Sequence, residues 1–260
     1  MRAKRWIARG ALVVTALAVA IHPAAAQTIE TLSLRGQPQQ LRVYGTRGAG
    51  DPVLLSSGDG GWMHLAPEVA VMLAARGFFV VGFDTKEYLR GFTSGGATLR
   101  PEDEPADYRT LAEFAARGGS KKALLIGVSE GAALSALAAA DRATQPAIAG
   151  VIGLGLSDRN ELGWRWKDSV IYLTHGVPNE PTFSVAAIVD KLAPVPLAEI
   201  HSTHDEFSPL AQAQALLEKA SPPKRLWVVE ASDHRFSGGL AAFERCLFEA
   251  IAWVAQNRQP

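Results

Sequence analysis

The 260-residue sequence contains one cysteine, Cys246, which excludes an internal disulfide bond. It also lacks an excess of charge of either sign, with 26 basic and 26 acidic residues. A nucleic-acid-binding protein needs a basic stripe, so this balance argues against such a partner. Cys246 lies within a helical pattern near the end of the chain, where we expect a buried structural thiol rather than a nucleophile.

The first 26 residues have the three parts of a secretory signal peptide. Four basic residues come first: Arg2, Lys4, Arg5 and Arg9. An apolar stretch (11–21) and a small-residue cleavage signal (24–26) follow. The apolar stretch is short and rich in alanine, so a cleaved signal is favoured over an uncleaved anchor. We therefore expect export to the periplasm.

Residues 27–260 then form the mature chain, which we expect to fold as one domain. Removal of the signal leaves 22 basic and 26 acidic residues, a net charge of −4. That charge neither favours nor excludes peripheral contact with a membrane surface. The sequence does not indicate an oligomeric state.

Strand patterns and helical patterns alternate along the mature chain. The expected strands are 28–34, 39–44, 52–56, 78–83, 123–128, 148–154, 197–202 and 225–229. The expected helices are 65–76, 105–117, 132–140, 208–220 and 240–256. Apart from a leading hairpin, this rhythm predicts an α/β fold with a doubly wound, mainly parallel sheet. The carboxyl ends of its parallel strands would then share one edge.

Two stretches interrupt the alternation: a glycine-containing loop at 86–104 and a longer segment at 156–196. The second contains Trp164, Trp166 and a candidate extra strand at 169–174. Insertions at the carboxyl edge of such a sheet shape substrate pockets, so both are candidate lids. The alternative is a solvated surface loop with core-packed tryptophans.

Gly127-Val128-Ser129-Glu130-Gly131 lies between an apolar strand pattern and an alanine-rich helical pattern. A serine at a sharp strand-to-helix turn is the nucleophile elbow of the α/β-hydrolase fold. Glycines flank such a turn because the serine backbone is strained and larger neighbours would clash. The alternative is a chance match in a chain with 24 glycines, which its strand–helix context disfavours.

A serine nucleophile needs a base and an acid that orients the base. In this fold the acid and the histidine follow late strands, in the chain order Ser, Asp or Glu, His. Asp205 follows the strand 197–202 and His234 follows the strand 225–229. We therefore expect a triad of Ser129, Asp205 and His234. Glu206 is the alternative acid, and Asp233 is expected to shape the loop.

Other histidines are assigned less specific roles. His201 and His204 precede Asp205 at a spacing that resembles part of a metal site, but further ligands are not evident, and no metal or cofactor is expected. We expect His64 at a helix entry and His175 in a loop, and the alternative for either is a position that lines the substrate pocket.

An oxyanion hole requires two backbone N–H donors. One is expected from Glu130, directly after the nucleophile and at a helix N-terminus. The other is expected from Asp59 or Gly60, in the glycine-rich loop after the strand 52–56.

Together these segments resemble the VirJ/AcvB family of exported bacterial α/β-hydrolases. The resemblance is carried by Ser57-Gly58-Asp59-Gly60-Gly61-Trp62, by Gly127 to Ala132, by Asp205 and by Asp233 to Phe236. Val128 and Glu130 stand where VirJ proteins often have aromatic residues. The resemblance implies a link to virulence and type IV secretion and, for AcvB-type members, hydrolysis of lysyl-phosphatidylglycerol.

The favoured hypothesis is therefore a periplasmic serine hydrolase that cleaves an aminoacyl-phospholipid ester. Trp62, Trp164 and Trp166 are candidate substrate contacts, because an aromatic face attracts an ammonium group. Asp59 and Glu130 could bind the same group through their carboxylates. The alternatives are a carboxylesterase or lipase for small acyl esters, and a non-catalytic, VirJ-like accessory protein for secretion.

Overall fold

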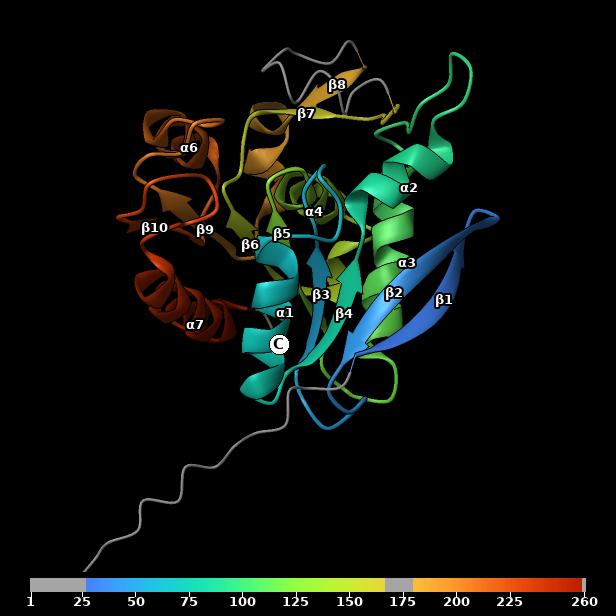
Figure 1. Cartoon of the computed structure of the whole chain (residues 1–260), viewed down its shortest axis with the longest axis horizontal. Helices are drawn as coiled ribbons and strands as arrows, with labels where there is room; N and C mark the ends of the chain where they lie inside the picture. The colour runs from blue at the N-terminus through green and yellow to red at the C-terminus, as the bar shows by residue number, and fades with distance from the viewer. Residues whose placement is uncertain (1–26, 167–179, 259–260) are drawn as a thin grey trace, which may run out of the picture.

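A computed structural model describes residues 27–166 and 180–258 (Figure 1). Its main sheet has the strands β1 (Thr28–Leu34), β2 (Gln37–Tyr44), β3 (Pro52–Ser56), β4 (Phe79–Phe83), β5 (Ala123–Val128), β6 (Ile148–Leu154), β9 (Leu197–Ser202) and β10 (Lys224–Val229). Their spatial order is β1-β2-β4-β3-β5-β6-β9-β10. β2 runs antiparallel to both of its neighbours, β1 and β4. The six remaining strands, β4, β3, β5, β6, β9 and β10, are parallel to one another. The predicted mainly parallel sheet is confirmed.

Helices cover both faces of this sheet. They are α1 (Leu65–Ala75), α2 (Thr85–Phe92), α3 (Glu104–Ala116), α4 (Glu130–Ala140), α6 (Leu210–Lys219) and α7 (Leu240–Asn257). α1 and α7 pack on one face, and α3, α4 and α6 pack on the other (Figure 1). Within the described residues no helix is long and apolar enough to cross a membrane.

The two faces have separate hydrophobic cores because successive strand residues point in opposite directions. On β3, Leu54 belongs to the core under α3 and α4, whereas Val53 and Leu55 belong to the core under α1 and α7. All three are fully buried, and each contributes about 1.5–3 kcal/mol to folding. Strands with both faces covered read as the continuous apolar runs seen in the sequence.

Helix α2 occupies the first part of the stretch 86–104, which the sequence predicted to be a loop. The loop prediction is therefore wrong for residues 86–92. Asp84 caps the helix: its Oδ1 accepts a hydrogen bond from the Glu87 N–H at 3.2 Å. Its Oδ2 accepts a second one from the Trp62 N–H at 3.1 Å. Gly91 lowers the helix propensity of this segment, which is why the sequence did not predict a helix here. In the structure Tyr88 and Leu89 form the buried face of α2.

Within the 156–196 insertion, β7 (Arg159–Glu161) and β8 (Thr182–Ser184) pair as a small antiparallel two-stranded sheet, and two short 3-10 turns follow β8. Asp158 fastens this sheet, because its Oδ1 accepts hydrogen bonds from Ser184 Oγ at 2.7 Å and Ala186 N at 2.8 Å. Figure 1 places β7 and β8 at the end of the molecule toward which the parallel strands point. The expected signal peptide and the candidate strand 169–174 lie outside the described residues.

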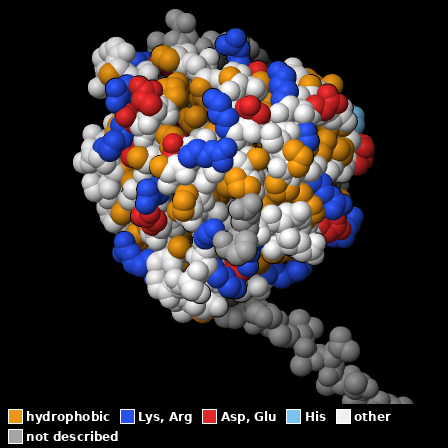
Figure 2. All heavy atoms as spheres, turned by 180° about the vertical axis from the view of Figure 1, so that it is seen from behind, with side chains coloured by type: hydrophobic (Ala, Val, Ile, Leu, Met, Phe, Trp, Pro, Cys, Tyr) orange, Lys and Arg blue, Asp and Glu red, His pale blue; other side chains and the backbone are white. Residues whose placement is uncertain are grey.

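Charged side chains on the face seen in Figure 2 are interspersed with one another and with apolar ones, and no single-sign stripe crosses that view. Cys246 lies on α7 and is half-buried against the core. Burial raises the pKa of its thiol, which fits the structural role expected for it.

Candidate active site

Ser129 stands at the apex of the turn between β5 and α4, as predicted. Its backbone has φ 51° and ψ −115°, a combination that residues other than glycine rarely adopt. Its N–H donates to the Leu154 carbonyl of β6 at 2.9 Å. The side chain is half-buried, so the turn lifts the hydroxyl to the carboxyl edge of the sheet.

The two glycines of the elbow are required by close backbone contacts. A Cβ on Gly127 would overlap the backbone of Gly131, where helix α4 turns back over the strand. A Cβ on Gly131 would overlap the carbonyl oxygens of Ser56 and Ser57 at the end of β3. The second glycine therefore allows the glycine-rich loop after β3 to lie directly against the elbow.

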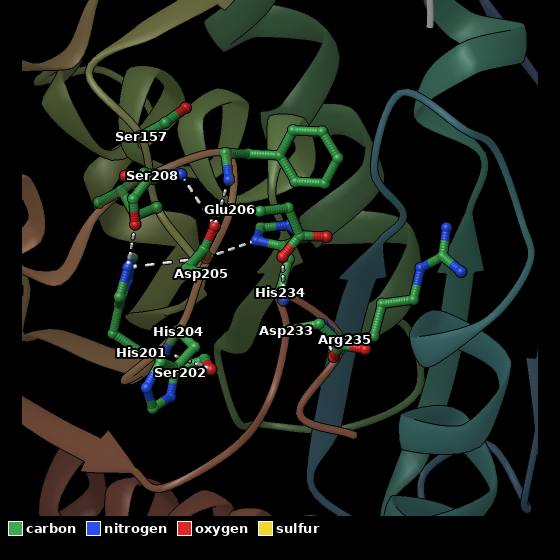
Figure 3. A network of polar contacts seen from close by, with 12 residues as sticks. Ser157, His201, Ser202, His204, Asp205, Glu206, Ser208, Asp233, His234 and Arg235 are labelled. Carbon is green, nitrogen blue, oxygen red and sulfur yellow. Dashed lines mark hydrogen bonds and ion pairs between the residues drawn. The ribbon is translucent and has the colours of Figure 1, made fainter. Parts of the chain in front are cut away.

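Asp205 and His234 form a buried, hydrogen-bonded pair at the ends of β9 and β10 (Figure 3). His234 Nδ1 lies 2.5 Å from Asp205 Oδ2. The other carboxylate oxygen, Oδ1, accepts from the N–H groups of Phe207 at 2.9 Å and Ser208 at 2.8 Å. Burial alone would raise the pKa of Asp205, but the hydrogen bond and charge of His234 and these two N–H groups lower it. The carboxylate is thus held ionised and fixed in direction.

Gly155 connects the His234 ring to the elbow. It has φ +72°, and a Cβ there would lie 2.5 Å from His234 Cε1. The carbonyl oxygen of Leu154, the residue before Gly155, accepts a hydrogen bond from the Ser129 N–H. The elbow and the His234 imidazole therefore contact adjacent residues at the end of β6. His234 Nε2 is buried and has no hydrogen-bond partner among the described residues. This nitrogen therefore makes no hydrogen bond to a described residue that would prevent it from accepting a proton.

The alternative acids have other contacts. Glu206 Oε2 accepts the backbone N–H of His234 at 2.8 Å, and its side chain is exposed. Asp233 Oδ1 accepts the N–H groups of Arg235 and Ser237, each at 2.9 Å. Both carboxylates accept hydrogen bonds from backbone N–H groups of the loop after β10, which carries His234. Asp205 is the carboxylate that contacts the imidazole ring of His234.

His201 and His204 do not converge on a common point. His201 is fully buried, with Nδ1 3.0 Å from Glu199 Oε1 and Nε2 2.7 Å from the Ser208 carbonyl oxygen. His204 is exposed, with Nδ1 3.0 Å from the Ala231 carbonyl oxygen. No group of three or more potential metal ligands occurs in residues 27–166 and 180–258. Sequence analysis missed Glu199, whose signal is a carboxylate between two apolar residues of the strand, Ala198 and Ile200.

The glycine-rich loop lies beside the serine. The Gly61 N–H donates to the Gly58 carbonyl at 3.0 Å, which closes a tight turn around Asp59 and Gly60. A Cβ on Gly58 would lie 3.4 Å from Ser129 Cβ. The predicted second oxyanion donor, from Asp59 or Gly60, therefore belongs to a loop that touches the nucleophile.

Glu130 is a buried carboxylate at the first turn of α4. Its side chain is 7% exposed, and Oε1 has no hydrogen-bond partner among the described residues. Burial raises its pKa well above the usual value, and the charges of Asp59 and Glu161 raise it further, against one opposing hydrogen bond from the Glu161 backbone. Three carboxylates from the elbow, the glycine-rich loop and β7 thus lie close together.

The three candidate tryptophans occupy different environments. Trp62 packs on β4, since a Cβ on Gly82 would overlap its ring, and the Arg42 guanidinium lies 5.3 Å from its ring centroid. Trp164 is 7% exposed and belongs to the core. This matches the alternative given for it from the sequence, a tryptophan packed in the core. Trp166 is 77% exposed. The structure does not bring the three together around the serine.

His64 is the N-terminal cap residue of α1, as predicted. His175 lies outside the described residues.

The elbow and the sheet topology define the class: the chain has the α/β-hydrolase fold. Residues 51–250 match the family described as bacterial virulence protein (VirJ), and the chain belongs to this family. The predicted family is therefore confirmed. A search of curated proteins found no match.

Solved structures show the same fold at low sequence identity. The α/β hydrolase GrgF from a Penicillium species has a TM-score of 0.65 at 13% identity and covers 90% of this chain and 99% of its own. Dienelactone hydrolase from Anabaena variabilis has a TM-score of 0.64 at 16% identity, covering 91% and 100%. Est1E from Butyrivibrio proteoclasticus has 0.61 at 14%, covering 86% and 99%.

Proposed function

We propose that this protein is a periplasmic serine hydrolase that cleaves an ester through an acyl-enzyme, with an aminoacyl-phospholipid such as lysyl-phosphatidylglycerol as substrate. The observation that carries the chemistry is the 2.5 Å His234–Asp205 pair beside the Ser129 elbow. The signal-peptide pattern of the first 26 residues supports the exported location, and the resemblance to AcvB-type proteins supports the lipid. The esterase and dienelactone hydrolase among the structures with this fold support ester hydrolysis.

In the acylation step, Ser129 Oγ attacks the ester carbonyl carbon while its proton moves to His234 Nε2. Asp205 stabilises the imidazolium that forms. The oxyanion accepts hydrogen bonds from the Glu130 N–H and from the loop N–H of Asp59 or Gly60. Collapse of this intermediate breaks the ester C–O bond, and His234 returns its proton to the departing alcohol oxygen.

In the deacylation step, water attacks the acyl-enzyme and gives a proton to His234. The bond between the acyl carbon and Ser129 Oγ then breaks, and the proton returns to the serine. The products are a free acid, here an amino acid, and the lipid alcohol. The resting enzyme is restored.

The preference for a cationic acyl group rests on Glu130. A buried carboxylate with an unpartnered oxygen is unfavourable unless a donor or cation reaches it. An aminoacyl ester carries an ammonium group close to its carbonyl carbon, and Glu130 follows the nucleophile directly. A bound ammonium would satisfy Glu130 Oε1 and would also be attracted by the charges of Asp59 and Glu161.

Purified wild-type protein is expected to release lysine from lysyl-phosphatidylglycerol in mixed micelles. Ser129→Ala removes the nucleophile and should lower kcat by at least about a thousand-fold. Ser232→Ala is the matched control, because it removes an exposed hydroxyl from the loop that carries His234. Equal lysine release by Ser129→Ala and wild type would contradict the mechanism.

The same assay separates the alternatives. Turnover of short acyl esters without lysine release, lost in Ser129→Ala, would identify a carboxylesterase. A folded wild type with no turnover of either substrate would favour a binding role in secretion, since fold alone does not fix function.

Glu130→Gln keeps the backbone N–H and the shape of the side chain but removes its charge. We expect kcat/KM for lysyl-phosphatidylglycerol to fall by about 10- to 100-fold, as for loss of a buried charge pair. Hydrolysis of p-nitrophenyl acetate, which is neutral, should change less than about threefold. Equal losses on both substrates would show that Glu130 does not recognise the cation.

A further inference from the structure

His201 makes two hydrogen bonds that together define its charge. Nε2 lies 2.7 Å from the Ser208 carbonyl oxygen, which can only accept, so this nitrogen carries a proton. Nδ1 lies 3.0 Å from Glu199 Oε1, and the same oxygen accepts the Leu156 N–H at 2.8 Å. An ionised Glu199 carboxylate can only accept, and in that state Nδ1 carries a proton as well. A ring with both nitrogens protonated is an imidazolium.

This ring stands directly behind the proposed catalytic acid. His201 Nε2 lies 3.6 Å from Asp205 Oδ2, the oxygen that pairs with His234 Nδ1 at 2.5 Å. Figure 3 shows Asp205 between the two imidazoles. Both His201 and Glu199 are at most 1% exposed, so water does not screen these charges.

We propose that His201 is a positioning residue of this active site: a buried imidazolium, held by Glu199, that supports Asp205 on the side opposite His234. The inference rests on the proposed triad for its catalytic consequence. The charge of His201 itself can be measured without any substrate.

Room for the supporting pair is built into the neighbouring strand. A Cβ on Gly153 of β6 would overlap Glu199 Oε2, so glycine is needed there for this carboxylate to fit. Glu199 Oε2 has no hydrogen-bond partner among the described residues. A buried carboxylate with one oxygen unpaired is tolerated when a cation compensates its charge, and His201 supplies that cation.

The groups that face His201 favour its charged form. Burial alone would lower the pKa of His201, but Glu199, the Ser208 carbonyl and the Asp205 carboxylate raise it above the usual value. A positive charge on His201 in turn weakens the electrostatic attraction between Asp205 and a proton on His234. His201 and His234 therefore act on the same carboxylate oxygen, Asp205 Oδ2.

The same contacts fix the loop that carries the acid. Ser208 donates its N–H to Asp205 Oδ1 at 2.8 Å, and its carbonyl accepts from His201 at 2.7 Å. His201 therefore holds the loop after β9 against that strand through Ser208. This contact orients the Asp205 carboxylate, in addition to the electrostatic effect of the His201 charge.

Nitrogen-15 NMR of the wild-type protein without substrate tests the charge directly. Both ring nitrogens of His201 should show protonated signals from about pH 6 to pH 8, where an unperturbed histidine loses its charge. In Glu199→Gln the counter-charge is lost, and His201 should lose one ring proton within this range. A neutral His201 ring in the wild type at pH 7 would overturn the proposal whatever the enzyme hydrolyses.

The pH profile of p-nitrophenyl acetate hydrolysis tests the catalytic consequence. His201→Gln keeps a donor for the Ser208 carbonyl but removes the charge, so the acidic limb of kcat/KM should move up by about one pH unit. The plateau of kcat should fall about tenfold with little change in KM. His204→Gln, an exposed neighbour, should match the wild type.

A fall in kcat at every pH with an unmoved acidic limb would assign His201 a structural role only and contradict the proposal. If His201→Gln does not fold, the profile of Glu199→Gln replaces it, because neutralised His201 should move the limb in the same direction. Wild-type protein with a charged His201 but no dependence of turnover on Ser129 would instead refute the proposed function.

Discussion

At the scale of single residues, the site depends on positions where no side chain fits. Gly155 allows the His234 ring to lie against the backbone of β6's end, since a Cβ would approach His234 Cε1 to 2.5 Å. The same residue has φ +72°, a conformation that is strained for alanine. Its substitution should therefore disturb both folding and the geometry of the histidine.

Gly155→Ala is expected to lower kcat/KM by about 100-fold, because a shift of the order of 1 Å in a catalytic group has that effect. It should also lower stability by about 1–2 kcal/mol from backbone strain. Both are measured on purified protein, by ester hydrolysis and urea unfolding.

Gly77→Ala serves as the control. It has φ +86° but nothing within 4 Å of its Cβ position. It should lose similar stability and keep wild-type activity. If Gly155→Ala were also fully active, Gly155 would not position His234.

The sequence predicted Ser129, Asp205 and His234 as the triad because chain order and strand ends constrain their positions strongly. It did not identify Glu199 or Gly155. Their roles arise from contacts between β6, β9 and the histidine loop, and no local pattern encodes which residues meet across strands. Glu130 was predicted to be a backbone donor, and the burial of its side chain near Asp59 and Glu161 became evident only in the structure.

At the scale of elements, the leading hairpin is fastened to the helical layer by its turn. Arg35, with φ 47°, donates from Nε at 2.9 Å and from Nη2 at 2.6 Å to Asp107 Oδ2 of α3. Tyr88 Oη donates to the same oxygen at 2.7 Å, and the guanidinium lies 3.8 Å from the Phe92 ring centroid. One side chain thus joins β1–β2 to α2 and α3.

Arg35→Ala should lower the free energy of unfolding by about 2–3 kcal/mol, because it leaves the buried Asp107 without its cation. Activity per folded molecule should be retained, since the hairpin is remote from β9 and β10 in the sheet order. Urea unfolding measures the change.

Arg109→Ala is the matched control, since it removes an exposed i,i+4 ion pair with Glu113. Its effect should stay within about 0.5 kcal/mol. Equal losses in the two variants would mean that Asp107 does not depend on Arg35.

Most element types were predictable, and several boundaries were not. α4 begins at Glu130 and α6 at Leu210, two residues from the predicted starts at 132 and 208. The strained Ser129 conformation starts α4 early, and Pro209 precedes α6 as its cap residue. The two-stranded sheet of β7 and β8 was not predicted, because strands of three residues have too little periodicity to detect.

At the scale of the whole molecule, the parallel sheet explains why residues far apart in sequence meet. β5, β9 and β10 are parallel to their neighbours, so Ser129, Asp205 and His234 all follow strand ends at one edge. The two-stranded sheet of β7 and β8 lies at the same end of the molecule (Figure 1). Alternating patterns predicted the parallel sheet, whereas the strand order depends on contacts that only folding brings together.

The central claim is that Ser129 is a nucleophile activated by His234. The most direct measurement is reaction of the folded protein with a fluorophosphonate, followed by peptide mass spectrometry. We predict one covalent adduct, on Ser129, with labelling slowed by at least about a hundred-fold in His234→Ala. Folded wild-type protein that is not labelled, or is labelled at another residue, would contradict this account.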